Sequence, residues 1–339
     1  MKPREIFMRS LRRQSVPRPA VGSATSIVTL DLMRKVGHFF PEAHLNPKEM
    51  AALAAAGYTE LGLDNVNPLF GVWHESAALG CPMDWGKIDR MPDGHAILAD
   101  VAETPVIPKD FLAHPACRVP LEAIARLKKE LGDEVAVVGK VFGPWTLGYH
   151  LYGVSQFLLG TLMNPDGVRR AMDVLKQVTI RFAKAQIDAG ADALTFADHA
   201  TRDLCSPETY RDFLIEAHQE LHETIPCPLI LHICGDTADR IPYIRETGIE
   251  CFHFDSKVPA RLARELAGET LALHGGTSNI RVIRNGTVED ARRDAREKVE
   301  AGIDIIGPEC AVPLDAPYEN IKVLAEEAKR CRLAGHSAN

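Results

Sequence analysis

Residues 228–235 read Pro-Leu-Ile-Leu-His-Ile-Cys-Gly, an apolar run that ends in a histidine, a cysteine and a glycine. A short apolar run of this kind predicts a buried β-strand over Pro228–Ile233. Because residues two apart in a strand point to the same face, we expect His232 and Cys234 to lie side by side where the strand ends. Imidazole and thiolate groups together suit a borderline-soft metal, most often zinc.

A second apolar run, Ile303–Gly307, leads into Pro308-Glu309-Cys310. If the fold brings the two strand ends together, His232, Cys234 and Cys310 form a site with three protein ligands and one open position. Such an open position distinguishes a catalytic zinc site from a structural one. A histidine and a cysteine two residues apart also occur by chance, so the prediction of a catalytic zinc site depends on Cys310.

Strand and helix patterns alternate along the chain. The predicted strands are Arg18–Ser23, Glu60–Asn65, Val135–Phe142, Ala193–Asp198, Pro228–Ile233, Glu250–Asp255, Thr270–Gly275 and Ile303–Gly307. The predicted helices are Pro47–Ala56, Leu121–Leu131, Pro165–Ala189, Pro207–Thr224, Arg240–Thr247, Pro259–Leu266, Val288–Ala301 and Pro317–Arg330. Several begin at a proline behind a capping residue and several end at a glycine, as helices commonly do.

Eight strand and helix units in 339 residues predict an α/β fold with a parallel sheet. They favour a (β/α)8 TIM barrel over an open sheet, and no G-x-G-x-x-G motif follows the first strand to indicate dinucleotide binding. We expect one domain over 1–339, with 68–119 as an elaborated connection after the second strand that lies over the barrel mouth. Residues 1–17 and 332–339 are expected to be peripheral ends.

The barrel prediction places a site at the C-terminal ends of the strands, where such folds carry their active sites. Any one polar residue there could be a helix cap, but six predicted strands deliver an ionisable or metal-binding group to the same rim. These residues are Asp64, Asn65, Asp198, His199, His232, Cys234, Asp255, His274, Glu309 and Cys310. Together they favour a functional site over a purely structural explanation.

Roles for these residues follow from their chemistry. Glu309 is expected behind the metal ligands or as an exchangeable fourth ligand, and His253 is expected to pack within or behind the sixth strand. Asp198, Asp255 and His199 could orient the ligands, because a metal-bound imidazole usually donates its other N–H to a nearby acceptor. We therefore predict catalytic roles for Glu309, Asp198 and Asp255, and substrate contacts from Asp64, Asn65, His199, His274 and Tyr152.

Composition excludes several classes of function. The net charge of -7, with no basic run, argues against nucleic acid as a partner. No signal core and no stretch of about 20 apolar residues is present, so we expect a cytoplasmic protein without membrane contact. The eight cysteines, which form no CxxC pair, do not resemble a disulfide framework.

Motifs spread over nearly the whole chain resemble the uroporphyrinogen decarboxylase superfamily. The resemblance is to its zinc-dependent branch, which includes methylcobamide:coenzyme M methyltransferases and related corrinoid-dependent methyltransferases. The residues that carry it are Arg18–Gly22, Phe40–His44, Leu63–Pro68, Ala78–Cys81, His232-Ile233-Cys234-Gly235, Glu309–Pro313, Ala316-Pro317 and Glu319-Asn320. The H-x-C motif with the late cysteine is specific to the zinc branch.

The decarboxylases themselves are a poorer match. They carry an arginine-rich motif where this chain has Val21-Gly22-Ser23-Ala24-Thr25, and G-H-G where it has Pro308-Glu309-Cys310. Asp64 falls at the position of their catalytic aspartate, but without the arginines its role is expected to differ.

The resemblance implies a (β/α)8 barrel that holds zinc on His232, Cys234 and Cys310. It also implies methyl exchange between the cobalt of a corrinoid (cobalamin), carried on a separate corrinoid-binding protein, and a substrate heteroatom. That heteroatom is a thiol, as in coenzyme M, or the oxygen of a methoxylated compound. Two alternatives remain: a uroporphyrinogen decarboxylase-like lyase, and a non-catalytic binding protein of the same fold.

Overall fold

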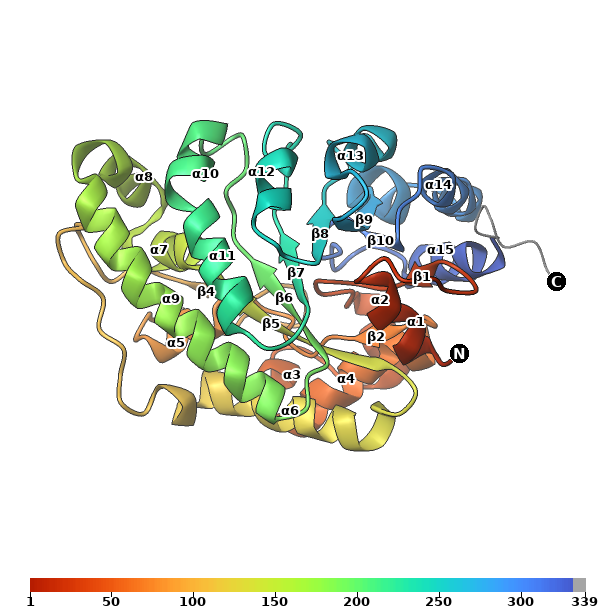
Figure 1. Ribbon diagram of the computed structural model, residues 1–339. Coiled ribbons are helices and arrows are strands. Elements are labelled where there is room, and N and C mark those ends of the chain that lie inside the picture. The colour runs from red at the N-terminus through yellow and green to blue at the C-terminus, as the bar shows by residue number, and fades with distance from the viewer. Residues whose placement is uncertain (332–339) are drawn as a thin grey trace.

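A computed structural model describes residues 1–331 and shows eight parallel strands in one sheet with helices around it (Figure 1). The strands follow the order β1-β10-β9-β8-β7-β6-β5-β2 and form a nearly closed barrel, which confirms the predicted (β/α)8 fold. Their bounds are Ala20–Val21 (β1), Asn65–Val66 (β2), Ala136–Phe142 (β5), Ala193–Ala197 (β6), Leu229–His232 (β7), Cys251–Phe254 (β8), Ala272–Thr277 (β9) and Ile305–Pro308 (β10). A separate antiparallel hairpin joins β3, Met83–Asp84, to β4, Asp93–Gly94.

Helices connect and cover the strands. In the first half of the chain they are α1 (Pro3–Ser10), α2 (Leu30–Val36), α3 (Glu42–Leu45), α4 (Pro47–Thr59), α5 (His74–Ala78), the 3-10 helix η1 (Phe111–Ala113), α6 (Pro115–Leu131), α7 (Pro144–Tyr152) and α8 (Val154–Met163). The second half holds α9 (Pro165–Asp188), α10 (Pro207–Phe213), α11 (Ile215–Thr224), α12 (Ile241–Glu246), α13 (Ala260–Ala267), the π-helix η2 (Asn279–Arg284), α14 (Val288–Glu300) and α15 (Tyr318–Arg330).

Seven of the eight predicted strands coincide with observed ones, and the second is wrong. The sequence predicted Glu60–Asn65, whereas α4 continues to Thr59 and β2 begins only at Asn65. The predicted helix Pro207–Thr224 is also wrong as one element, because the chain breaks into α10 and α11 at Leu214. Both errors lie where the local hydrophobic pattern is continuous but tertiary packing sets the boundary.

The lower layer of the barrel interior is apolar and is closed by α1. Ile6, Phe7 and Leu11 are buried against inward-facing strand residues such as Val138 and Ile230. The expectation that residues 1–17 are peripheral is therefore wrong, since α1 buries its apolar face across the N-terminal end of the barrel. The other predicted end, 332–339, lies outside the described residues.

One step further along the strands, the inward-facing positions become polar. Because side chains alternate between the two faces of a strand, the residues two beyond the apolar layer also point inward. They are Lys140, Thr195, His232, His253 and His274, and all five are buried. A barrel interior is ordinarily filled by branched apolar side chains, so this layer indicates a polar floor beneath the C-terminal rim.

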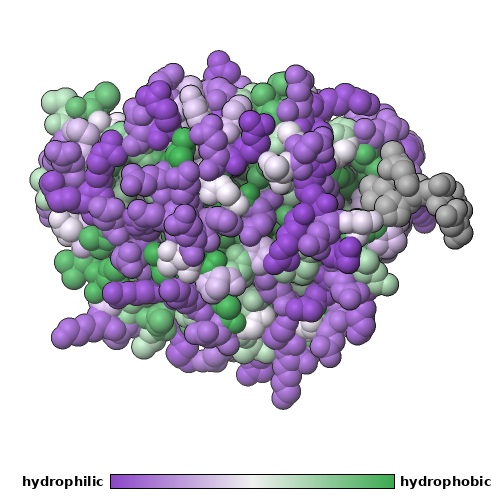
Figure 2. Space-filling view, viewed as in Figure 1, coloured by the Kyte–Doolittle hydropathy of each residue, from purple (hydrophilic) through white to green (hydrophobic). Residues whose placement is uncertain are grey.

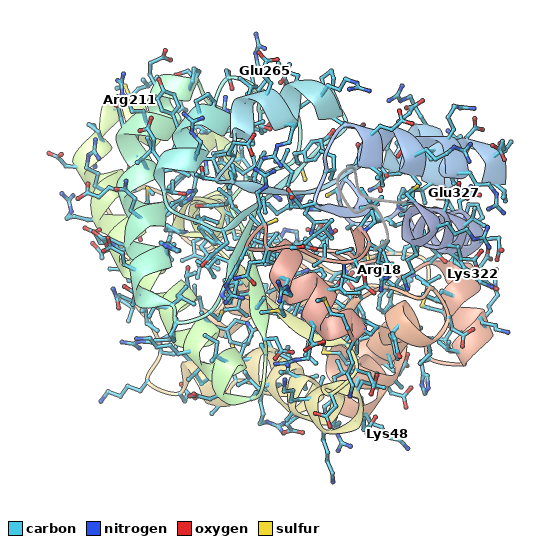
Figure 3. The ribbon with its side chains drawn as sticks, turned by 45° about the vertical axis from the view of Figure 1, so that its right-hand side comes forward. Arg18, Lys48, Arg211, Glu265, Lys322 and Glu327 are labelled. Carbon is cyan, nitrogen blue, oxygen red and sulfur yellow. The ribbon has the colours of Figure 1, made fainter. Side chains whose placement is uncertain are left out.

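Asp64 and Asn65 close the sheet between β1 and β2, at the N-terminal ends of the strands. The side-chain amide of Asn65 accepts a hydrogen bond from the Ser23 N–H at 2.9 Å and donates one to the Ser23 carbonyl at 2.8 Å. The Asp64 carboxylate accepts two bonds from Arg18, at 2.7 and 2.8 Å, and one from the Val21 N–H (Figure 3 labels Arg18). Since β2 pairs with the first residues of β5, the rim position predicted for Asp64 and Asn65 is wrong.

The connection after β2 packs beside the C-terminal end of β5. Glu75 accepts a bond from the Phe142 N–H at 2.8 Å, and the Tyr152 hydroxyl donates to the Glu103 carbonyl. Residues 68–119 therefore border the rim that carries the candidate site.

Among the described residues, no helix is both long and apolar enough to cross a membrane. The face in Figure 2 is mostly hydrophilic, with hydrophobic atoms gathered at the upper left. The exposed apolar residues of α8, which lies there in Figure 1, are Val154, Leu159, Leu162 and Met163.

Candidate metal centre

His232, Cys234 and Cys310 converge at the C-terminal end of β7. The His232 Nε2 lies 3.0 Å from the Cys234 Sγ and 3.5 Å from the Cys310 Sγ, and the two sulfurs are 3.1 Å apart. The structure thus brings together three residues from two segments that are 76 positions apart in the chain.

The spacing of these three atoms fits a metal. Bonds of about 2.0–2.3 Å around a tetrahedral zinc separate neighbouring donors by roughly 3.3–3.8 Å. The three observed distances are close to this range, and one nitrogen with two sulfurs is a donor set that zinc prefers. The residues present can therefore hold a zinc ion after small movements of their side chains.

The two thiols do not hold their protons equally. The hydrogen bond from Cys234 lowers the pKa of Cys310 well below its usual range. The same hydrogen bond, together with burial, raises the pKa of Cys234. Because a thiolate is the form that binds metal, Cys310 is prepared for coordination.

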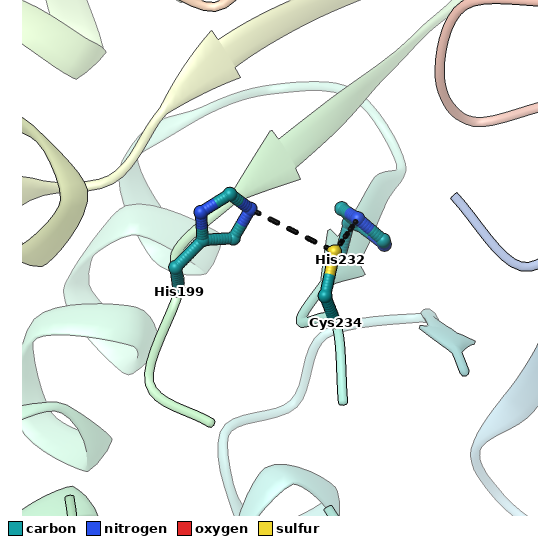
Figure 4. A group of neighbouring side chains, drawn as sticks. All are labelled: His199, His232 and Cys234. Atoms are coloured by element: carbon teal, nitrogen blue, oxygen red, sulfur yellow. Dashed lines mark hydrogen bonds between the residues drawn. The ribbon is translucent and has the colours of Figure 1, made fainter. Parts of the chain in front are cut away.

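His199, which follows β6, borders the same group. Its Nε2 lies 4.0 Å from the Cys234 Sγ, a contact drawn as a dashed line in Figure 4. His199, His232 and Cys234 each offer one ligand atom, and these three atoms lie within 4.8 Å of one another. The sequence predicted a substrate contact or an orienting role for His199. Its position also suits a fourth protein ligand to the metal.

His253 was expected to pack within or behind the sixth strand, and it is buried within that strand, with its ring directed at a metal ligand. Its Nδ1 lies 2.7 Å from the Nδ1 of His232, and its Nε2 lies 2.8 Å from the Pro308 carbonyl oxygen. His232 and His253 are 21 residues apart and pair in register on neighbouring strands, and the same spacing leads to His274 on the next strand. This repeat was the sequence signal that could have indicated its place.

Glu309 and Asp255 tie together the loops around the metal centre. The two carboxylate oxygens of Glu309 accept bonds from the Ser256 N–H at 2.9 Å and the Asn279 N–H at 2.7 Å. Asp255 accepts a bond from the Gly235 N–H at 2.9 Å, next to Cys234. These contacts position the ligand-bearing loops, and the predicted catalytic roles of both carboxylates stay predictions.

Asp198 lies behind His199, and only its backbone reaches His232, through a hydrogen bond from the Asp198 N–H to the His232 carbonyl oxygen at 3.1 Å. It is fully buried and accepts bonds from the Thr146 N–H at 2.7 Å and the His218 Nε2 at 3.0 Å. The Tyr210 hydroxyl lies 2.9 Å from the other nitrogen of His218. Asp198 therefore fixes the loop that carries His199 rather than orienting His232, and sequence reasoning missed His218.

His274 and Tyr152 were predicted to contact substrate. His274 is fully buried in the polar floor, with its ring tilted by 50° to the His253 ring and the two ring centres 4.7 Å apart. Tyr152 is buried against Phe157, and burial raises the pKa of its hydroxyl to about 12. Neither residue lies at the open rim.

A second polar group adjoins the metal centre on the side of α5. Lys140 and Glu75 are fully buried, as are His74 and His44 from α5 and α3. Burial lowers the pKa of Lys140 to about 8 and raises that of Glu75 to about 7, and the charges of Glu75 and Cys310 act on Lys140. Sequence reasoning missed this group because the helices around the barrel supply three of its four residues.

The Glu75 carboxyl makes stability depend on pH. Its pKa is raised from 4.5 to about 7, so the contribution is fully present below pH 4.5 and is lost as the pH rises through 7. We expect wild type to lose about 2–3 kcal/mol relative to Glu75→Gln between pH 5 and pH 8. Urea unfolding of both proteins at the two pH values measures this difference.

The exposed Glu130 offers a matched control for the same substitution. Glu130→Gln should follow wild type at both pH values. A Glu75→Gln variant whose stability tracks that of wild type from pH 5 to pH 8 would show that Glu75 is ionised in the folded protein.

Comparisons with known proteins agree with this geometry. The model of the uroporphyrinogen decarboxylase (URO-D) family matches residues 2–331. A methylated-thiol–coenzyme M methyltransferase of Methanosarcina mazei is 34% identical over 302 residues, which cover 89% of this chain and 82% of that protein. The methylcobamide:CoM methyltransferase MtaA of Methanosarcina barkeri is 31% identical, over 94% of this chain and 95% of the relative.

A solved structure gives the same result. A methyltransferase from Methanosarcina mazei superposes with a TM-score of 0.93 at 30% identity, over 97% of this chain and 98% of that one. The match runs through the barrel and through both segments that carry the metal centre. The chain belongs to the uroporphyrinogen decarboxylase (URO-D) family.

Proposed function

We propose that this protein is a zinc-dependent methyltransferase that moves a methyl group between a corrinoid, carried by a partner protein, and a thiol substrate. The observation that carries the proposal is the triangle of His232 Nε2, Cys234 Sγ and Cys310 Sγ. The names of the relatives, which are methyltransferases acting with coenzyme M and methylcobamide, support the same reaction.

The residues around the triangle each contribute to such a site. Zinc bound there would lower the pKa of a thiol so that its sulfur is a nucleophile at neutral pH. Cys310, with its lowered pKa, and His232 and Cys234 hold the ion, and His199 borders the remaining position. Asp198 and Asp255 fix the loops that carry His199 and Cys234.

A thiol fits better than a methoxylated compound. The first of the relatives named above carries methylated thiol and coenzyme M in its name, so both of its partners contain sulfur. Decarboxylation is the weaker alternative. Arg18, near the N-terminus, is bound to Asp64 at the far end of the barrel, so neither can meet a substrate at the metal centre.

The reaction can be tested with free methylcobalamin in place of the corrinoid protein. We expect loss of the methylcobalamin absorbance in the presence of thiols, and no formation of methylcobalamin when cob(I)alamin is mixed with methoxylated aromatic compounds. Methylation of cob(I)alamin by methoxy compounds, without turnover of thiols, would reverse the assignment. Turnover with neither class, by a folded and zinc-loaded protein, would contradict the proposal.

Lys140 predicts a preference for thiols that carry a negative charge. It is buried in the floor beneath the metal centre, and the charge of Cys310 reaches it. A hydrogen bond to a charged group contributes about 1.5–3 kcal/mol, so Lys140→Met should raise the KM for 2-mercaptoethanesulfonate by about 10–100-fold. The KM for neutral 2-mercaptoethanol should change little.

Lys176 provides the matched control, because it is a mostly buried lysine on α9 that already pairs with Glu220. Lys176→Met should leave both KM values as in wild type. An equal rise in KM for the charged and the neutral thiol in Lys140→Met would show that Lys140 only supports the fold.

A cytoplasmic location and the absence of nucleic acid and membrane partners stay predictions.

A further inference from the structure

His253 occupies a position that links the two segments of the metal centre. It lies on β8, between the strand that ends in His232 and the strand that leads to Cys310. Its ring contacts both segments, through the His232 Nδ1 at 2.7 Å and the Pro308 carbonyl at 2.8 Å. The ring is fully buried, with the His274 ring 4.7 Å away.

The Pro308 carbonyl fixes the proton on His253. A carbonyl oxygen only accepts hydrogen bonds, so the Nε2 of His253 must carry the hydrogen. A second proton would place a charge in a buried site with no acidic partner at either nitrogen, which is costly. His253 is therefore neutral, and its Nδ1 is an acceptor.

The same reasoning extends to His232. Its Nδ1 faces the acceptor nitrogen of His253 at 2.7 Å, so that Nδ1 must be the donor. A neutral His232 then has no hydrogen on Nε2, the nitrogen that faces Cys234 and Cys310. A neutral imidazole binds a metal through the nitrogen that carries no hydrogen, and here that nitrogen faces the two sulfurs.

The backbone around His253 leaves room for this contact. To reach Pro308 on β10, the His253 ring passes over Gly275 on β9, whose φ is +97°. A Cβ at Gly275 would lie 2.6 Å from the His253 Cδ2, 2.7 Å from its Nε2 and 3.1 Å from the Pro308 oxygen. Glycine is therefore required here, both for its conformation and for the hydrogen bond beside it.

We propose that His253 is a positioning residue that holds His232 in its Nδ1–H tautomer and braces it against the segment that carries Cys310. The metal part of this inference rests on the proposed function, whereas the tautomer does not. Hydrogen-bond partners behind metal ligands commonly change metal affinity by about 10–100-fold.

The first test is zinc affinity, measured by competition with a chromophoric chelator. We expect His253→Leu to bind zinc about 10–100-fold more weakly than wild type. His253→Asn should bind more tightly than His253→Leu, because its amide oxygen can accept from the His232 Nδ1–H. Wild-type affinity in a correctly folded His253→Leu would overturn the proposal.

His274 is the matched control, since it is equally buried and pairs in register with His253 on the next strand. In residues 1–331, neither of its ring nitrogens makes a hydrogen bond to His232, Cys234 or Cys310. His274→Leu should therefore keep wild-type zinc affinity. An equal loss in His274→Leu would show that packing of the floor, and not the hydrogen bond, sets the affinity.

The second test needs no metal. Nitrogen-15 NMR of histidine-labelled, metal-free protein should show His253 as the Nε2–H tautomer and His232 as the Nδ1–H tautomer, with His253→Asn assigning the signals. The opposite tautomer at either ring would overturn the inference. If wild type shows these tautomers but binds no zinc, the proposed function fails while the tautomer assignment stands.

Discussion

Replacing Cys310 with alanine is expected to remove tight zinc binding and, with it, methyl transfer. Cys310 supplies the thiolate of the site, since its pKa is lowered well below its usual range. Its loss leaves the imidazoles of His199 and His232 and the thiol of Cys234, a set that lacks the thiolate with the lowered pKa. Because even partners behind the ligands contribute about 10–100-fold, we expect affinity to fall by more than about 100-fold.

Elemental analysis and chelator competition measure this effect directly. Cys227 provides a matched control, because it precedes β7 at the opposite end from Cys234 and lies outside the metal centre. Cys227→Ala should retain one zinc per chain and wild-type turnover. Retention of zinc by Cys310→Ala, or loss of zinc by both variants, would contradict the assignment of Cys310.

Replacing Asp64 with asparagine is expected to destabilise the protein by about 3 kcal/mol without changing zinc content. Asp64 is fully buried and accepts three hydrogen bonds, two from Arg18 and one from the Val21 N–H. Removing one partner of a buried ion pair leaves the other charge uncompensated and commonly costs about 3–5 kcal/mol. The lost free energy of folding weakens the contact between β1 and β2.

Urea unfolding of Asp64→Asn and wild type gives the stability difference, and zinc content with KM gives the functional one. Asp31, which pairs with Arg34 on the surface, offers a control in which Asp31→Asn should change stability by less than about 1 kcal/mol. A raised KM in Asp64→Asn with unchanged stability would restore the predicted substrate contact.

The sequence predicts the barrel well because its strands are buried on both faces. The runs before His232 and Cys310 are long enough to be read without tertiary information. The second strand, Asn65–Val66, follows a hydrophobic pattern that continues from α4, so the local pattern does not show where the strand begins. Placing Asp64 and Asn65 on the wrong end of the barrel follows from that single error.

Some residues of the site can also be predicted from local patterns, whereas others depend on contacts between distant segments. The period of two in a strand predicts that His232 and Cys234 lie together, and parallel strand ends predict that Cys310 joins them. The contact of His253 with Pro308 depends on the stagger of strands β8 to β10, which no local pattern contains. The burial of α1 in the barrel end is unpredictable for the same reason, since its partners lie far away in the chain.

X-ray absorption at the zinc edge tests the central claim most directly, because it counts the sulfur atoms bound to the metal. We predict two sulfurs at about 2.3 Å and at least one nitrogen at about 2.0 Å in the zinc-loaded protein, and a third sulfur after addition of a thiol substrate. A sulfur count that stays at two when a thiol turns over, or a site without sulfur, would contradict the account.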